Sequence, residues 1–443
     1  MPPLIESEIK PKLGLFDTIL IVINLVVGIG IFRTPALVAS KLPNVEMFFL
    51  SWLVGGIVAI CGALTFAEIG ARLPKAGGLY KVVSIVYHPL VAFMLNWTYI
   101  LTLAVSTAGV ALIGAEYISP LLFPQSGNIQ NYHKLMVIAI ILACFAINFI
   151  GIKSGAATLK ILSFLKMLLI LVICSSVFYI AVPAPILEHG IGSYTKTNDF
   201  GTALVAVFYT LGGYQCVLNF GADVKKPLKN IPRAIIIGLL VIIVIYFLLN
   251  AVYVKVLGFE QLSSSHLVVA DVAKSVWGDT GLRITSIAIF LSVLGYVNVY
   301  IMQTPRLLFA MAEDHIFPPV FKKINTRTQV QEVALVVFTL LTLFATLVIK
   351  TFETIVNYVI IIDSITLSAV AFTLFFLRKK QEKNSYDGYK IPLYPWLPLI
   401  FILFLGYFTV SIFLSQPLIA MQGVGLLLAG APLYLLIKRL RKD

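Results

Sequence analysis

Two glycines interrupt the first long hydrophobic stretch of this chain, Val27-Gly28-Ile29-Gly30-Ile31-Phe32, and two more interrupt the sixth, Leu211-Gly212-Gly213-Tyr214. A helix broken inside a bilayer is tolerated only where its freed backbone groups face protein or a watery cavity. One isolated pair of glycines would more often serve close packing of helices. Because the two breaks lie five spans apart, they instead predict a solute site near the middle of the membrane, as in secondary transporters.

The composition is that of an integral membrane protein. Of the 443 residues, 59% are hydrophobic and 12% are charged, which is too apolar for a soluble globular protein. We therefore predict an all-α polytopic membrane protein with twelve transmembrane helices, each long enough or nearly so to cross about 30 Å of hydrocarbon. The predicted spans are residues 15–40, 47–71, 83–113, 134–151, 156–182, 201–223, 234–257, 282–311, 333–350, 354–377, 395–414 and 417–437.

The order of the spans predicts an internal repeat. Residues 15–182 and 201–377 form two blocks of five helices, and each block opens with a glycine-broken span, as expected of an inverted repeat. Residues 395–437 add helices eleven and twelve, and residues 1–14 and 438–443 are short tails. The first span has full transmembrane length and lacks a cleavage pattern, so we expect it to be retained.

Two of the polar segments also carry predictions. The outer segment 266–277 has apolar residues at roughly helical spacing and is expected to lie as a short helix over the bundle. Glu68 and Asp223 fall at predicted inner helix ends, where salt bridges explain them as well as transport does. The five histidines are scattered without ligand spacing, so we expect neither a metal site nor another cofactor.

The net charge of +13 is best explained by membrane topology. Most of the 33 Lys and Arg residues fall in alternate connecting segments, and the positive-inside rule then predicts that both termini are cytoplasmic. The excess of basic residues therefore does not indicate binding to nucleic acid. The expected location is a cell membrane, plasma or inner, and the expected partners are the lipid bilayer and a small substrate, while the sequence identifies no partner subunit.

The broken helices predict how a zwitterion would bind. The outer half of helix one begins at the midplane with free amides, which suit an α-carboxylate. Its inner half ends at the midplane with free carbonyls, which suit an α-ammonium. Helix six offers further carbonyls at its own break, and the glycines leave the backbone open to the substrate. The predicted substrate-binding residues are Val26, Val27, Gly28, Ile29, Gly30, Ile31, Tyr209, Thr210, Leu211, Gly212, Gly213 and Tyr214.

These residues resemble the amino acid-polyamine-organocation superfamily, most closely in pattern the L-type amino acid transporters and their bacterial relatives. Gly28 to Phe32 is similar to the family's Gly-Ser-Gly-Ile-Phe signature, and the other matching segments extend the resemblance over about residues 10–330. Those segments are Phe66 to Gly70, Pro74 to Tyr80, Tyr209 to Tyr214, Asp223 to Arg233, and Arg306 to Asp314 followed by Pro318.

The resemblance implies a leucine-transporter-like fold of five plus five inverted helices, with exchange or proton-coupled transport. It also implies that an aromatic residue at the Tyr209 position gates the substrate. Two positions depart from the family pattern. Ile29 replaces a small hydroxyl residue, so carboxylate binding must rest on backbone amides, and Tyr209 stands where many relatives have Phe, which adds a hydroxyl without an identified partner.

Lys166 is the most informative charged residue inside a span. It lies 13 residues after Lys153, about 20 Å along a helix, which places it near the midplane. An ionisable residue there is costly and is functional by default. The resemblance implies that this lysine occupies the space used for sodium in related transporters and braces broken helix one, and a desolvated lysine is alternatively able to carry the coupled proton itself.

Arg33 and Asp363 are the remaining candidates for gating. Arg33 lies one turn outward of Gly30 and Asp363 lies midway along helix ten, so we hypothesise that they form an ion pair at an outer gate. The alternative, which is equally supported, is that Arg33 faces the outer vestibule and Asp363 pairs elsewhere.

These features together predict a sodium-independent carrier of neutral L-amino acids that works by alternating access. A carrier of another organic cation or of a polyamine is the main alternative, but Arg33 and Lys166 are opposed only by Asp363, which favours a zwitterion. A channel or a membrane sensor is less well supported because the polar residues gather at the two breaks. An enzyme is not expected, since the sequence has no phosphate loop, nucleophile elbow or metal cluster.

Overall fold

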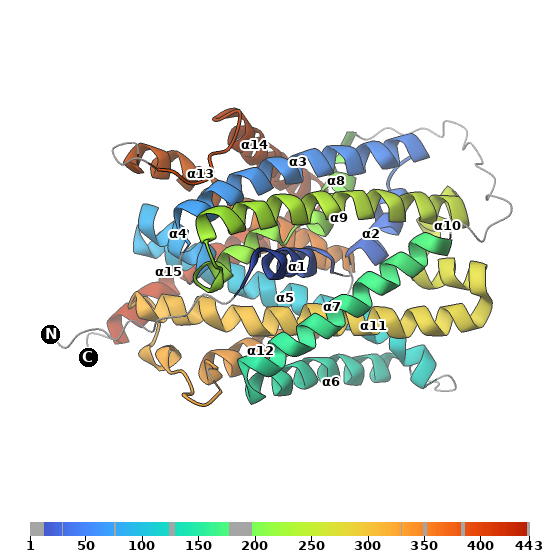
Figure 1. The fold of residues 1–443 in the computed structure, drawn as a ribbon, viewed down its shortest axis with the longest axis horizontal. Helices are drawn as coiled ribbons and strands as arrows, with labels where there is room; N and C mark the ends of the chain where they lie inside the picture. Colours follow the sequence, from blue (N-terminus) through green and yellow to red (C-terminus); the bar gives the residue numbers. More distant parts are fainter. Residues whose placement is uncertain are drawn as a thin grey trace.

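The computed structural model describes residues 13–28, 30–74, 77–123, 129–176, 197–328, 330–348, 352–381 and 386–440. Within these ranges the regular elements are helices, most of them aligned along one direction (Figure 1). They are α1 Leu15–Val26, α2 Gly30–Ala39, α3 Val45–Arg72, α4 Gly78–Val86, α5 Pro89–Leu122, α6 Ile129–Ile150, α7 Ile152–Ser175, α8 Thr197–Leu211, η2 Tyr214–Asp223, α9 Pro227–Leu257, α10 Phe259–Ser264, α11 Val268–Glu313, η3 Pro319–Lys322, α12 Glu332–Val348, α13 Phe352–Gln381, α14 Trp396–Ser415 and α15 Pro417–Leu440.

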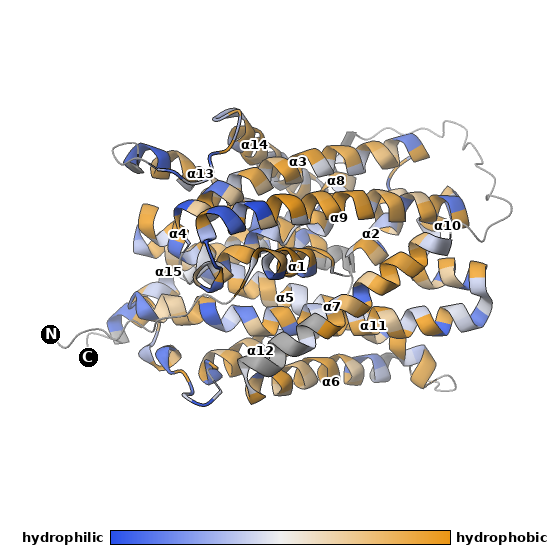
Figure 2. Ribbon diagram, viewed as in Figure 1, coloured by the Kyte–Doolittle hydropathy of each residue, from blue (hydrophilic) through white to orange (hydrophobic). Residues whose placement is uncertain are grey.

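The helices are long and apolar enough to cross a membrane. Among the described residues nine spans meet this requirement, or ten when α1 and α2 are taken as one bent span. Most residues along the helices are hydrophobic (Figure 2), and many large ones, such as Leu403 and Leu414, are exposed. In water this would be an unstable exterior, but in a bilayer it faces lipid. The protein is therefore a multi-pass, all-helical membrane protein.

The helices differ in how deeply they lie in the bundle. In the most apolar stretch of α5, 83% of the residues are buried inside the protein, against 17% in α15. The central helix α5 packs against α11, while α3 packs against α9, and α1 lies near the middle of the bundle (Figure 1). The protein core thus surrounds the first broken helix, and α15 lies at the periphery.

Both predicted helix breaks are present. The axes of α1 and α2 are bent by 42° relative to each other, and α8 ends at Leu211, after which the chain continues as the 3-10 helix η2. Gly213 adopts φ 112°, a left-handed conformation that glycine alone adopts without strain. A Cβ at this position would lie 2.3 Å from Leu25 O in α1, so the two breaks are in direct contact.

Some span boundaries differ from the prediction. The predicted third span, 83–113, is divided, because α4 ends at Val86 and Pro89 starts α5 at the first helical position, where proline needs no amide hydrogen bond. The predicted eighth span, 282–311, is the straight part of a longer helix, α11, which is kinked at Gly278. The part of α11 before this kink covers most of segment 266–277, so the short helix predicted there is confirmed.

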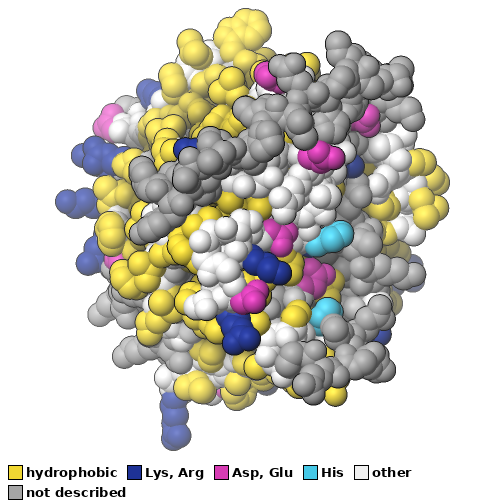
Figure 3. Space-filling model, turned by 90° about the vertical axis from the view of Figure 1, so that its right-hand side faces the viewer, with side chains coloured by type: hydrophobic (Ala, Val, Ile, Leu, Met, Phe, Trp, Pro, Cys, Tyr) yellow, Lys and Arg dark blue, Asp and Glu magenta, His cyan; other side chains and the backbone are white. Residues whose placement is uncertain are grey.

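The two ends of the bundle carry polar contacts. At the terminal end, where α1 begins and α15 ends, Glu68 is fully buried and accepts hydrogen bonds from Arg72, Arg378 and the Ile391 amide. The predicted salt bridge of Asp223 is also confirmed, since Asp223 Oδ2 lies 2.9 Å from Arg306 NH1. At the opposite, far end, acidic and basic side chains lie side by side near the middle of the surface (Figure 3).

Candidate functional site

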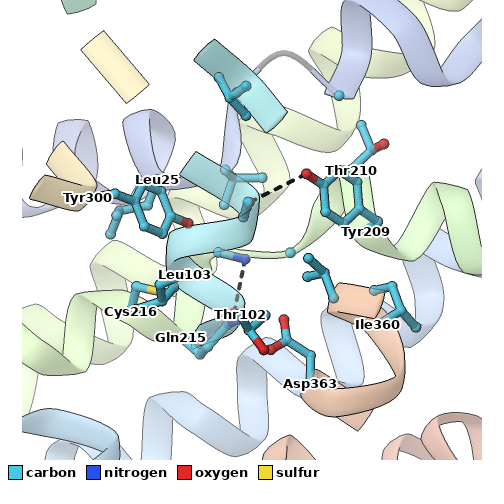
Figure 4. Close-up of a pocket in the computed structure, with 18 of the residues that line it drawn as sticks. Leu25, Thr102, Leu103, Tyr209, Thr210, Gln215, Cys216, Tyr300, Ile360 and Asp363 are labelled. Carbon is cyan, nitrogen blue, oxygen red and sulfur yellow. Dashed lines mark hydrogen bonds between the residues drawn. The ribbon is translucent and has the colours of Figure 1, made fainter. Parts of the chain in front are cut away.

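A cavity of about 50 Å³ lies where the two helix breaks meet. Residues from both breaks line it, together with residues from α5, α11 and α13 (Figure 4). A cavity needs at least about 10–15 Å³ to hold one water molecule, so this one is large enough for ordered water or a small polar group. The site is thus compact and lies inside the bundle.

Seven of the twelve predicted substrate-binding residues line this cavity: Val26, Gly28, Gly30, Tyr209, Thr210, Gly212 and Gly213. Val27, Ile31, Leu211 and Tyr214 are buried in the protein core but do not line it. Ile29 lies outside the described residues. The glycines are needed at close contacts, since a Cβ at Gly30 would lie 2.9 Å from Thr210 Oγ1 and one at Gly28 would lie 2.8 Å from the Tyr296 ring.

The carbonyl groups at the end of α1 are already engaged by the protein. Val26 O accepts hydrogen bonds from the Gly28 amide at 2.7 Å and from the Tyr246 hydroxyl at 3.2 Å. Val27 O accepts one from Lys166 Nζ at 2.5 Å. Val26 O thus accepts two protein hydrogen bonds and Val27 O faces the Lys166 ammonium, whereas Tyr209 O at the end of α8 accepts one, from the Gly212 amide, and keeps a lone pair for an α-ammonium.

Lys166 reaches the first break from α7. Its side chain is only 1% exposed, and its contact with Val27 O places the ammonium at the C-terminal end of α1. The partial negative charge of a helix C-terminus stabilises a cation there. The predicted contact between this lysine and the unwound part of helix one is confirmed.

The predicted ion pair between Arg33 and Asp363 is wrong for this structure. Arg33 NH1 lies 3.6 Å from Glu116 Oε2 on α5 and donates a hydrogen bond to His266 O. Asp363 instead reaches the central cavity. Arg33 is therefore held at the far end by nearer acceptors, which matches the alternative that it faces an outer vestibule.

Tyr209 has a partner that the sequence did not identify. Its hydroxyl lies 3.4 Å from Ser106 Oγ on α5, and the same Ser106 Oγ lies 3.0 Å from the Tyr296 hydroxyl on α11. Figure 4 shows Tyr209 beside the cavity. The hydroxyl that distinguishes this chain from the usual Phe thus links α8 to α5, and through Ser106 to α11.

The sequence interpretation missed the walls of the cavity contributed by α5 and α11. These residues are Tyr99, Thr102, Leu103, Ser106 and Val110 on α5, and Tyr296 and Tyr300 on α11. A signal was present, since Thr102 and Ser106 on α5, and likewise Tyr296 and Tyr300 on α11, are spaced four residues apart and so share one face of their helix. Tyr99 also lies 3.0 Å from Cys216 Sγ, which connects α5 to η2.

The chain is similar over nearly its whole length to known amino acid transporters and exchangers. The serine/threonine exchanger SteT of Bacillus subtilis is 26% identical over 98% of each chain. The human large neutral amino acids transporter small subunit 2 is 26% identical over 97% of this chain and 80% of its own length. The mouse Asc-type amino acid transporter 1 is 24% identical over 97% of this chain and 81% of its own.

A family model described as amino acid permease matches residues 13–436. This match covers nearly the whole chain and confirms the resemblance to the amino acid-polyamine-organocation superfamily. The similar proteins named above are transporters and exchangers, not enzymes. The chain belongs to the amino acid permease family.

Proposed function

We propose that this protein is a sodium-independent secondary transporter of neutral L-amino acids that works by alternating access, through exchange or proton symport. The observation that carries the proposal is the contact of two broken helices at a central cavity. In that arrangement helix ends of opposite polarity face one small space, which suits the two charges of a zwitterion.

The substrate carboxylate would bind the amides at the start of α2, at Ile29, Gly30 and Ile31. A helix N-terminus is a ready anion site because its first amides lack intrahelical partners. The α-ammonium would bind at the end of α8, near Tyr209 to Leu211, because Val26 O already accepts two protein hydrogen bonds and Val27 O faces the Lys166 ammonium, while Tyr209 O accepts one. Tyr209 would close over the substrate as its gate.

Sodium independence follows from Lys166. Its ammonium occupies the space beside the unwound end of α1, at Val27 O, and a second cation at that place would be strongly repelled at low dielectric. Lys166 would couple the helix break to the surrounding scaffold, either as a brace or as the carrier of a proton.

The proposed architecture has twelve transmembrane helices, with five-helix inverted repeats at residues 15–182 and 201–377 and with helices eleven and twelve at 395–437. Two shorter apolar helices, Ile161–Ser175 and Glu332–Leu347, support this number in addition to the longer spans. The basic residues support cytoplasmic termini in a plasma or inner membrane. Arg33, with Glu116 and His266 O, remains a candidate for an outer gate at the far end.

The experiment is uptake and counterflow of labelled amino acids by purified protein in liposomes. We expect small neutral L-amino acids to be taken up and exchanged, with the rate unchanged when sodium is replaced by choline. Uptake that collapses without sodium would contradict the coupling proposal, and failure to exchange any amino acid would contradict the substrate class.

A further inference from the structure

Asp363 presents a carboxylate to the cavity from α13. Among the described residues that line this cavity it is the single charged side chain. Its Oδ1 is buried and has no hydrogen-bond partner in the part of the chain that the structure describes. Figure 4 shows it pointing toward the space beside Thr102 and Gln215.

The neighbouring polar groups are committed to other partners. The Thr102 hydroxyl donates to Thr98 O at 3.1 Å, and Gln215 Oε1 accepts from the Gly213 amide at 3.0 Å. Tyr99 lies 3.0 Å from Cys216 Sγ. The groups named here, from α5 and η2, are thus hydroxyls, an amide and a thiol, and none is a cation.

The two basic residues predicted near the first break have other partners. Lys166 Nζ donates to Val27 O at the end of α1, and Arg33 pairs with Glu116 at the far end. A buried carboxylate without a protein cation is costly unless a ligand supplies the missing donor. A purely structural role would require a partner within the protein, and the described residues provide none for Oδ1.

We infer that Asp363 is a selectivity residue that binds a hydrogen-bond donor on the substrate side chain, a hydroxyl or an ammonium, which extends the substrate range beyond neutral amino acids to small basic ones. This inference rests on the proposed function, because the backbone at the two breaks would hold the α-carboxylate and α-ammonium that all amino acids share. The side chain then extends into the remaining space, where the free carboxylate oxygen accepts from it. A charge-assisted hydrogen bond of this kind is stronger than one between neutral groups.

The first test uses matched substrates on the wild-type protein. Alanine, serine and 2,3-diaminopropionate differ at one position by a hydrogen, a hydroxyl or an ammonium, and norvaline and ornithine form a longer pair. Competition against a labelled amino acid in purified protein should show the donor-bearing member binding at least about tenfold more tightly in one or both sets. Equal affinities within both sets would overturn the inference.

The second test compares two substitutions that each remove one carboxylate from the membrane region. Asp363→Asn should lower the affinity for the ammonium-bearing substrate about tenfold or more and leave alanine within about twofold. Glu46→Gln on α3 is the matched control, because Glu46 does not line the cavity and has no part in the proposed gate, and it should leave the preference unchanged. If Asp363→Asn elutes as a folded protein in size-exclusion chromatography but fails to bind alanine, a role limited to the substrate side chain is contradicted; if it does not fold, the wild-type comparison decides.

Two outcomes separate this inference from the proposed function. A wild-type protein that transports amino acids without preferring donor-bearing side chains contradicts the role of Asp363 and leaves the proposed function standing. A wild-type protein that transports no amino acid contradicts the proposed function. Loss of pH-driven uptake of every substrate in Asp363→Asn, with affinities unchanged, would overturn selectivity in favour of proton transfer.

Discussion

The two helix breaks are stabilised in different ways. At the first break, side chains from α7 and α9 hold the carbonyls of α1, through Lys166 on Val27 O and Tyr246 on Val26 O. At the second break, the freed amides bond locally, since the Gly212 amide donates to Tyr209 O and the Gly213 amide donates to Gln215 Oε1. The freed backbone groups of the first break are therefore held by neighbouring helices, while those of the second are satisfied within their own segment.

This difference suggests a division of roles. A break held by neighbouring helices moves when those helices move, which is what a transition between outward and inward states requires. A break held by its own amides keeps its shape and offers a constant part of the binding site. Substitutions of the residues that hold the first break should therefore act mainly on transport, and substitutions within the second break should act mainly on stability.

Gly30→Val should have the largest effect, because the new side chain would fill the site where both breaks meet. A Cβ there would lie 2.9 Å from Thr210 Oγ1 and 3.2 Å from Thr210 Cα. We expect the purified variant to insert in the membrane but to lose detectable amino acid binding. Gly406→Val on α14 is the control, since no heavy atom lies within 4 Å of its Cβ, and unchanged affinity in Gly30→Val would contradict the placement of the site.

Lys166→Ala should have the next largest effect and should act mainly on rate. Without the ammonium on Val27 O, movement of α1 is uncoupled from α7, so we expect transport to fall at least about tenfold, equivalent to about 1.4 kcal/mol in the barrier. Substrate binding should change less. Exchange and pH-driven net uptake are to be measured side by side in liposomes.

The two assays distinguish the roles of Lys166. Loss of both activities supports a brace, whereas intact exchange with lost pH-driven uptake supports a proton carrier. Full activity in both assays would exclude any mechanistic role for this residue.

Gly213→Ala should act mainly on stability and lower the Tm of the protein. The substitution combines a φ of 112° with a Cβ placed 2.3 Å from Leu25 O, and strained backbone of this kind costs about 1–3 kcal/mol. Gly278→Ala is the matched control, because its φ is 63° but no heavy atom lies within 4 Å of the new Cβ. Thermal unfolding in detergent should show the larger decrease in Tm for Gly213→Ala, and equal decreases would indicate that the contact between the breaks is unimportant.

Tyr246→Phe should have the smallest effect. It removes a single neutral hydrogen bond of 3.2 Å to Val26 O, worth about 0.5–1.5 kcal/mol, so the exchange rate should change only a few-fold. Tyr253→Phe on the same helix is the control, since the Tyr253 hydroxyl is buried without a hydrogen-bond partner in the described structure. A larger loss in Tyr253→Phe would contradict the role assigned to the contact at the first break.

Several features could be predicted because they depend on local sequence. The apolar spans, both glycine breaks and the depth of Lys166 follow from hydropathy, residue type and the 1.5 Å rise of a helix. The resemblance to known transporters further predicted that Lys166 would meet broken helix one, and the structure has that contact.

Pairings between distant helices required the tertiary structure. Arg33 pairs with Glu116 and not with Asp363, and Tyr209 meets Ser106 and, through it, Tyr296. Such contacts depend on the rotation and tilt of each helix about its neighbours, which the periodicity of a single sequence does not specify. The sequence by itself determined which segments span the membrane and where two of them break. Only packing decided that Asp363 faces the central cavity, because side-chain direction across the bundle is set jointly by all the helices in contact.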